Sequence, residues 1–361
     1  MAGLVELEAR WAEETRALVA ALETWRRAHP AATAREIEAA LDARLAALRA
    51  RLLADLLPGD SGGTGPRGAA AGGSDAAATL GEVIVERDLE YAVHDGVSLR
   101  GDLYLPAAEG RYPTLLLIHG GGWQIGSAAV YQYWGPFLAE RGYVAYAVTY
   151  RLSRPERPTY PQAVHDVKAA LQFLRGNAAE LRVDPERIGV LGNSAGGHLS
   201  ALLALSADSP KYAGAYPDDR YAAVSTRVKV AVPIYGVYDF VAQWEHDQLE
   251  RPRDQISEKF LGGSPMAIRD AYYEASPINW ATHQHSGVPF LVVWGMEDDV
   301  VDPATQAVPF VTALKRAGNT TRIVPIPGAP HFWISETPVL EPGSYTAHLA
   351  PRLLRFLAEY L

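Results

Sequence analysis

The chain has 361 residues, a formal net charge of −9, 48% apolar residues and no cysteine. The lack of cysteine excludes disulfides, thiolate metal sites and a cysteine nucleophile within these residues. The acidic balance disfavours sequence-independent binding to nucleic acid or to an anionic membrane, and the apolar fraction is sufficient for a packed core.

The first residues, MAGLVELEARWAEE, carry acidic side chains where a secretory signal has a basic start followed by an apolar run. Apolar runs such as Leu115-Leu116-Leu117-Ile118 are far shorter than the roughly 20 residues that cross a bilayer. We therefore expect a cytoplasmic protein without a membrane partner.

Residues 1–57 are rich in Ala, Arg and Glu and predict two helices. Apolar side chains recur at helical spacing between Leu4 and Trp25. A second stripe of such side chains runs from Ile37 to Leu56. A short hairpin is marginal alone, so we expect it to pair with a second copy, giving a homo-oligomer, or with the rest of the chain.

The segment 58–80 consists mainly of Gly, Ala and Ser and contains almost no large apolar residue. Such a segment cannot bury enough surface to order itself, which predicts a flexible linker. The domain boundaries that follow are a helical hairpin over 1–57, a linker over 58–80 and a larger domain over 81–361.

From residue 81 on, strand-like apolar runs alternate with helical patterns. This alternation predicts an α/β fold, with a mostly parallel eight-stranded sheet and helices on both faces. A longer insert at about 237–281, rich in Tyr, Trp and charge, predicts a lid or a wall of a substrate pocket. The expected strands are 83–91, 97–105, 114–119, 143–149, 187–192, 228–235, 290–294 and 321–326, and the expected helices are 161–175, 195–206, 303–316 and 345–360.

The expected strand 187–192 ends in the turn Gly192-Asn193-Ser194-Ala195-Gly196, which has the pattern G-x-S-x-G. At such a strand-to-helix junction the turn exposes the serine oxygen, and the glycines tolerate the strained backbone. Ser194 is therefore the candidate nucleophile.

A glycine run, His119-Gly120-Gly121-Gly122-Trp123, lies at the end of the expected strand 114–119. Backbone N–H groups can approach the oxyanion of an acyl transfer closely where side chains are absent. We expect the N–H groups of Gly121, Gly122 and Ala195 to form an oxyanion hole. A phosphate-binding loop is the alternative, but its G-x-G-x-x-G spacing fails at Ile125 and no Lys-Ser or Lys-Thr follows.

The acid and the base are expected in loops after the last two strands, in the order acid then histidine. His331 follows the strand 321–326 and is the candidate base. Asp298 and Asp299 both follow the strand 290–294, and only one of two adjacent side chains can meet the imidazole. We favour Asp298, three residues past a turn glycine, and expect Asp302 to cap the next helix.

The other histidines predict structural roles. His119 fits a hydrogen-bonding role in the glycine loop, and His283 and His285 form an H-x-H without a third ligand nearby. We therefore expect neither a metal nor another cofactor. Packing or capping is expected for the histidines in helical patterns, which are His165, His198 and His348.

At these motifs the chain resembles the hormone-sensitive-lipase-like esterases, and more closely the bacterial acetyl- and feruloyl-esterase-like carboxylesterases. The likeness covers about 83–361 and rests on YAVHDGVSLRGDLYLP, HGGGW, DPERIGVLGNSAGGHL, GAPHFW and the loop 295–301. It implies the α/β-hydrolase fold and cofactor-free hydrolysis of small carboxylic esters with short acyl groups, with Asp298 as the acid. Our candidates for the substrate pocket are Trp123, Asn193, Tyr235 and Trp333.

Two other functions fit part of this pattern. The same triad cleaves amides, so a formamidase or an oligopeptidase-like peptidase is one alternative. The other is a non-catalytic interaction protein, in which the helical hairpin binds a partner and the domain is a scaffold. An inert scaffold is expected to lack part of the triad or of the oxyanion loop, and no part is missing from the sequence.

A chain that starts at Gly81 tests the role of residues 1–80. A flexible linker cannot hold a group within the roughly 0.5 Å tolerance of a catalytic site, so we expect near-normal kcat on a small ester. Light scattering is expected to report a lower oligomer mass. A shortened protein that keeps its circular dichroism spectrum but loses turnover would show that these residues contribute to the active site.

Overall fold

A computed structural model describes residues 27, 29, 81–212, 215–285 and 287–361 of the chain. The predicted helical hairpin over 1–57 and the predicted linker over 58–80 lie outside these described residues, apart from Arg27 and His29. Both therefore stay predictions. The described part of the fold starts just before the first strand, β1.

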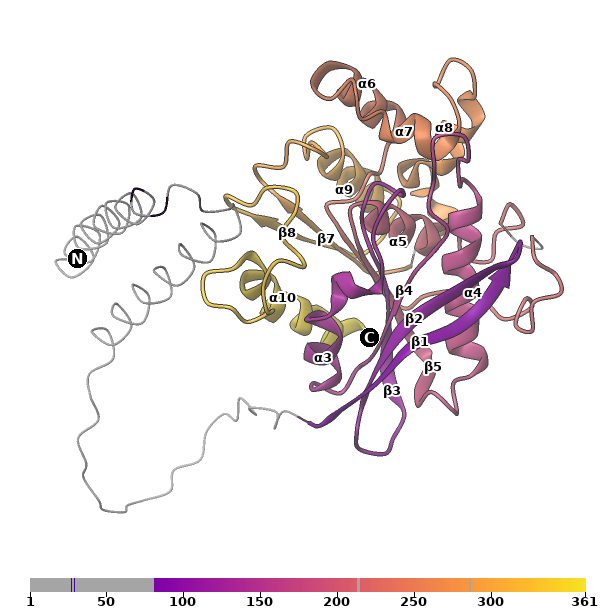
Figure 1. Ribbon diagram of the computed structural model, residues 1–361, viewed down its shortest axis with the longest axis vertical. Helices are drawn as coiled ribbons and strands as arrows, with labels where there is room; N and C mark the ends of the chain where they lie inside the picture. Colours follow the sequence, from indigo (N-terminus) through magenta and orange to yellow (C-terminus); the bar gives the residue numbers. More distant parts are fainter. Residues whose placement is uncertain (1–26, 28, 30–80, 213–214, 286) are drawn as a thin grey trace. The chain divides into compact units, whose positions relative to one another are not determined.

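An eight-stranded sheet forms the centre of the described chain, with the strand order β1-β2-β4-β3-β5-β6-β7-β8 (Figure 1). β2 pairs antiparallel with both β1 and β4, and the strands from β4 to β8 pair in parallel. This arrangement confirms the predicted fold class. The strands are β1 (Val83–His94), β2 (Val97–Pro106), β3 (Tyr112–Ile118), β4 (Val144–Val148), β5 (Val183–Asn193), β6 (Ala231–Ile234), β7 (Phe290–Gly295) and β8 (Thr321–Ile326).

The inner strands are apolar on both faces because helices cover both faces of the sheet. Every residue of β4, β6 and β7 is buried. The strands at the two edges are different. β1 has mostly exposed side chains and two register shifts along β2, and β8 contains Pro325 and exposes Ile323.

Helices pack on the two faces of the sheet in two separate apolar clusters. α4, α5 and α9 contribute to one cluster, and α3 and α10 contribute to the other. Among the described helices, none is both long enough and apolar enough to span a membrane. The helices are η1 (Ala128–Tyr131), α3 (Trp134–Ala139), α4 (Gln162–Gly176), α5 (Ala195–Ser206), α6 (Phe240–Glu250), α7 (Ile256–Leu261), α8 (Arg269–Ala275), η2 (Pro277–Trp280), η3 (His283–His285), α9 (Ala307–Arg316) and α10 (Tyr345–Tyr360).

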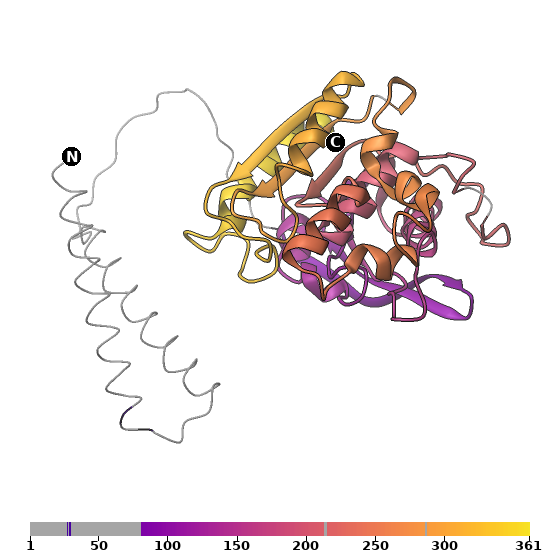
Figure 2. The ribbon, with the colours of Figure 1, turned by 90° about the horizontal axis from the view of Figure 1, so that it is seen from above.

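The segment predicted as an insert, 237–281, folds into α6, α7, α8 and η2. These helices lie at the top of Figure 1 and face the viewer in Figure 2. The rings of Phe240 and Phe260 lie 5.2 and 4.5 Å from the ring of Trp123, between centroids. The insert therefore packs on the loop that follows β3, and its action as a lid stays a prediction.

A buried ionic network ties the end of β1 to α4. His94 contacts Asp166 through Nδ1 at 2.7 Å and Asp219 through Nε2 at 2.8 Å, and Arg151 binds Asp166 at 2.6 Å. Burial alone would lower the pKa of His94, but the two carboxylates outweigh it and raise that pKa. A histidine that donates from both nitrogens is protonated, so Asp166 is shared by two buried cations.

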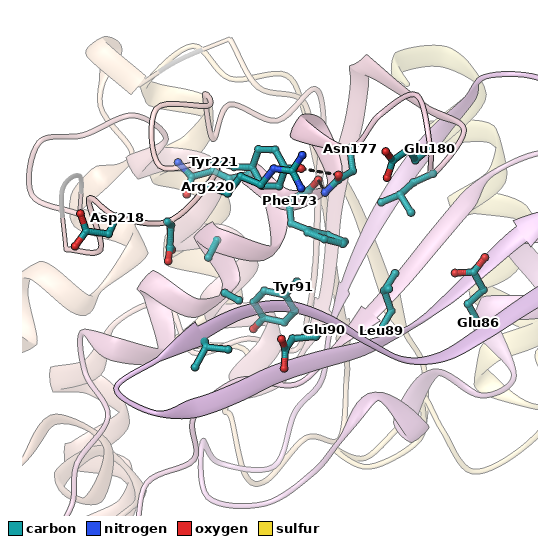
Figure 3. Close-up of a pocket in the computed structure, with 16 residues that line it drawn as sticks. Glu86, Leu89, Glu90, Tyr91, Phe173, Asn177, Glu180, Asp218, Arg220 and Tyr221 are labelled. Carbon is teal, nitrogen blue, oxygen red and sulfur yellow. Dashed lines mark hydrogen bonds between the residues drawn. The ribbon is translucent and has the colours of Figure 1, made fainter.

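A groove of about 720 Å³ opens beside β1, along α4 and the segment 218–221 (Figure 3). The rings of Tyr91, Phe173 and Tyr221 line it, together with acidic side chains that include Glu86. Its lining includes no residue of the glycine run, the serine turn or the acid and histidine loops. The groove is therefore separate from the candidate catalytic residues.

Asp166→Ala tests the buried network. It leaves Arg151 and His94 without their shared acceptor, and removing one partner of a buried ion pair typically costs about 3–5 kcal/mol in the free energy of unfolding. Urea denaturation monitored by circular dichroism measures the loss. As a control, Glu359→Ala removes an exposed pair with Arg322 and is expected to leave the urea midpoint almost unchanged; equal losses in the two variants would contradict the prediction.

Candidate active site

Ser194 sits on a tight turn between β5 and α5. Its backbone has φ 55° and ψ −120°, in the positive-φ region that non-glycine residues rarely adopt. The turn is stabilised by the Ser194 N–H, which donates to the carbonyl of Ile234 at 2.9 Å. Glycine is required at 196, because a Cβ there would lie 1.9 Å from the carbonyl oxygen of Ile118.

Ser194, His331 and Asp298 form one continuous chain of hydrogen bonds. Nε2 of His331 lies 2.8 Å from Oγ of Ser194, and Nδ1 lies 2.7 Å from Oδ2 of Asp298. A carboxylate only accepts, so Nδ1 carries the proton and Nε2 is free to accept the serine proton. All three side chains are buried, which strengthens these bonds relative to water.

The acid is fixed by its own loop. Oδ1 of Asp298 accepts the N–H groups of Val300 at 3.0 Å and Val301 at 2.8 Å, which leaves Oδ2 for the imidazole. Asp299 is exposed, and its main-chain carbonyl accepts from His246 at 3.0 Å. The structure therefore brings Asp298, not Asp299, to His331.

Asp302 lies beyond this loop, and the helix that we expected from 303 begins only at Ala307. The intervening residues form turns instead. Asp302 caps the first of these turns by accepting the N–H of Ala304 at 3.1 Å. Its predicted capping role is thus moved from the helix to the turn before it.

The glycine run lies directly against the serine turn. A Cβ at Gly120 would lie 3.0 Å from Cβ of Ser194. Gly121 and Gly122 have φ values of 115° and 57°, and a side chain at Gly121 would clash with the carbonyl of Ile125 at 2.1 Å. The run therefore needs glycine for its shape as well as for its exposed backbone.

Three N–H groups at this junction are available to a ligand. Within the described residues, the N–H groups of Gly121, Gly122 and Ala195 donate to no protein acceptor. Ala195 is the first residue of α5, where helix geometry leaves the N–H unpaired. An oxygen bound near Ser194 is the kind of acceptor that they lack.

The four residues that we expected to line the substrate pocket are all buried, and their role in a pocket stays a prediction. Asn193 clamps the loop, because its Oδ1 accepts the N–H of Gly120 at 3.1 Å and the hydroxyl of Tyr131 at 2.9 Å. Tyr235 lies 4.7 Å from the imidazole of His331, and Trp333 lies 5.3 Å from Tyr235, between ring centroids.

Trp123 is the fourth of these residues, and its indole is fully buried against Phe240 and Phe260 of the insert. Two exposed apolar side chains that the sequence analysis missed flank the site. Ile125 is 70% exposed two residues after Trp123, and Phe332 is 63% exposed beside His331, with a ring centroid separation of 4.7 Å. Both residues lie close to motif residues in the sequence, Ile125 to Trp123 and Phe332 to His331, and from this position they could have been predicted.

The side chains of two other histidines, His119 and His165, are not part of the hydrogen-bonded triad. His119 is buried, donates to the carbonyl of Gly120 at 2.6 Å, and has a pKa lowered to about 4 by burial. Burial also lowers the pKa of His165 to about 4. Among the described residues, no group of three or more His, Asp or Glu side chains is arranged to hold a metal ion.

The chain is similar to known families and proteins. Residues 101–314 match the BD-FAE family model. The probable carboxylic ester hydrolase LipM of Mycobacterium tuberculosis is 33% identical over 274 residues, which are 74% of this chain and 58% of LipM. Esterase LipC of the same organism is 35% identical over 61% of this chain and 52% of LipC. The chain thus spans little more than half the length of these curated relatives.

Solved structures match over more of their own length. The native structure of esterase Est2 from Thermogutta terrifontis is 27% identical, covers 79% of this chain and 95% of that one, and gives a TM-score of 0.59. The propionate-bound form of Est2 is 28% identical, covers 79% of this chain and 97% of that one, and gives 0.58. A truncated carbohydrate esterase from gut microbiota, at 23% identity, covers 78% of this chain and 99% of that one; its TM-score of 0.62 supports the fold alone.

Asp298→Asn and Asp299→Asn distinguish the two adjacent acids. An amide at 298 favours the wrong imidazole tautomer, which lowered kcat by roughly 10⁴ where the same change was made in another serine hydrolase. We expect a loss of this size for Asp298→Asn and a small change for Asp299→Asn, measured as kcat on p-nitrophenyl acetate. The reverse order in the two purified variants would move the role to Asp299.

Proposed function

Because the chain belongs to the BD-FAE family of α/β-hydrolase esterases, we propose that it is a serine carboxylesterase acting on small esters with short acyl groups. The observation that carries the proposal is the hydrogen-bonded chain of Ser194, His331 and Asp298 beside three free N–H groups. The names of LipM and LipC, and the match to Est2, support the same activity.

The acylation step begins with proton transfer. His331 takes the proton of Ser194 through Nε2 as the serine oxygen attacks the ester carbonyl, and Asp298 stabilises the resulting imidazolium. The carbonyl oxygen becomes an oxyanion that accepts hydrogen bonds from the N–H groups of Gly121, Gly122 and Ala195. Collapse of this intermediate breaks the bond to the alcohol, which leaves with the proton from His331.

Deacylation repeats the sequence with water in place of serine. His331 takes a proton from water as its oxygen attacks the acyl carbon of the acyl-enzyme. The second tetrahedral intermediate uses the same N–H groups, and its collapse releases the carboxylic acid and returns the proton to Ser194. The alcohol and the acid are the two products.

A preference for short acyl groups is supported by two observations. A Cβ at Gly122 would lie 3.6 Å from Cγ2 of Ile256, so Ile256 of the insert lies near the loop that we propose as the oxyanion hole. The propionate-bound structure of Est2 shows a short acid bound to that relative. Trp123, which we expected to restrict the site, is buried against Phe240 and Phe260 of the insert.

Ser194→Ala tests the nucleophile. We expect loss of p-nitrophenyl acetate turnover to background, since removing a triad nucleophile typically costs on the order of 10⁶ in kcat, and loss of labelling by a fluorophosphonate probe. Ser200→Ala is a matched control, because Ser200 is a buried serine of the same helix whose hydroxyl has no partner among the described residues. It is expected to keep both properties, and more than a few per cent of turnover in Ser194→Ala would contradict the proposal.

Substrate class is tested separately with the unmodified protein. A series of p-nitrophenyl esters from acetate to decanoate is expected to give its highest kcat/KM at acetate or butyrate. A matched acetyl anilide reports on the amidase alternative. A higher kcat/KM for decanoate would refute the short-acyl preference, and a higher value for the anilide would refute the esterase assignment.

A further inference from the structure

Trp123 closes the oxyanion loop in an unusual backbone conformation. Its φ is 59°, in the left-handed region that is costly for a large side chain. Strain of this kind persists only where surrounding contacts over-determine the position, and it is found preferentially at functional sites. The contacts that hold Trp123 therefore also hold the neighbouring glycines.

Two hydrogen bonds and the packing of two phenylalanine rings from the insert hold this residue. The carbonyl of Trp123 accepts the N–H of Ser153 at 2.7 Å, and its indole N–H donates to Nδ1 of His198 at 3.2 Å. The indole also stacks on Phe260 of α7, with 14° between the rings, and lies against Phe240 of α6. Without the hydrogen bond to His198, only packing would hold the indole of Trp123 in place.

His198 connects this loop to two other elements. It lies one turn after the nucleophile on α5, where its N–H donates to the carbonyl of Ser194 at 3.0 Å. Because Nδ1 accepts from Trp123, Nε2 carries the ring proton and donates to the carbonyl of Ala275 in α8 at 2.9 Å. The imidazole thus joins the nucleophile helix, the oxyanion loop and the insert.

The protonation state of His198 lets its Nδ1 accept a hydrogen bond from the indole N–H of Trp123. The side chain is fully buried, and burial lowers its pKa to about 3. It therefore stays neutral at any pH near neutrality, and its Nδ1 lone pair remains available to the indole N–H. A protonated imidazole has no acceptor and could not make this bond.

We propose that His198 is a positioning residue for the oxyanion hole: by holding Trp123 to the helix that begins after Ser194, it sets the distance from the Gly121 and Gly122 N–H groups to the nucleophile. The inference rests on the proposed esterase function. Oxyanion donors act only at about 2.7–3.1 Å from the oxyanion, and misplacement by about 1 Å can cost roughly 10²-fold in rate.

The test uses His198→Leu, Trp123→Phe and the double variant in the full chain. Both single changes remove the hydrogen bond between Trp123 and His198 and keep an apolar side chain at the site, while His198→Leu also removes the bond to the carbonyl of Ala275. We expect kcat on p-nitrophenyl acetate to fall tenfold to hundredfold with KM changed less than about twofold. The inhibition constant of an alkyl trifluoromethyl ketone, whose serine adduct carries an oxyanion, is expected to rise by the same factor.

The double variant is expected to lose less kcat than the product of the two single losses, because the hydrogen bond between Trp123 and His198 is counted in both of them. His198→Gln keeps one acceptor and one donor and is expected to recover part of kcat. Tyr272→Phe is the matched control, since it removes another hydrogen bond of the insert, from the buried side chain of Tyr272 to the carbonyl of Gly263 at 3.0 Å. Its kcat and inhibition constant are expected to stay within about twofold of the parent values.

The outcomes separate this inference from the proposed function. Losses that multiply in the double variant, unchanged kcat in both single variants, or equal losses in Tyr272→Phe would overturn the positioning role while esterase activity of the parent protein stands. A parent protein without ester turnover would overturn both proposals. If His198→Leu does not fold, Trp123→Phe removes the same hydrogen bond from the other partner, and its kcat and inhibition constant are then compared with those of Tyr272→Phe.

Discussion

Close contact between helix α5 and the ends of β3 and β6 is the constraint on which the active site depends. A Cβ at Gly196 would lie 1.9 Å from the carbonyl oxygen of Ile118, and one at Gly197 would lie 2.8 Å from that of Ile234. Glycine at both positions lets the helix start directly on the sheet, with Ser194 between the two strands. The positive end of the α5 dipole then faces the position that we propose for the oxyanion.

The parallel sheet explains how distant residues meet around this helix. Parallel strands present their carboxyl ends at one edge, so the loops after β3, β5, β7 and β8 converge there. His331 reaches Ser194 across a separation of 137 residues and Asp298 across a separation of 33. Each partner is then fixed locally, as by the two N–H groups that hold Asp298 and by the amide of Asn193 that holds the oxyanion loop.

Sequence predicts the parts of this site whose residues lie close together in the chain. The turn at Ser194 carries its strand, its glycines and its helix within one short stretch, and the order of acid and histidine along the chain is set by the sheet. Whether a side chain is buried depends instead on segments that are distant in the sequence. Trp123 follows the glycine run and Tyr235 follows a strand, positions that fit a pocket wall as well as an internal support, and the contact of Phe260 with Trp123 comes from a distant segment that no local pattern indicates.

The two outer strands differ from the inner ones in a way that matters for solubility. An open sheet ends in rows of unpaired N–H and C=O groups that could recruit a strand from another molecule. On β1 the charged side chains of Glu86, Arg87 and Asp88 coincide with a register shift, which makes a flat strand addition unfavourable. On β8, Pro325 lacks the N–H that a further strand would need. Both edge strands of the described sheet thus have features that disfavour edge-to-edge aggregation.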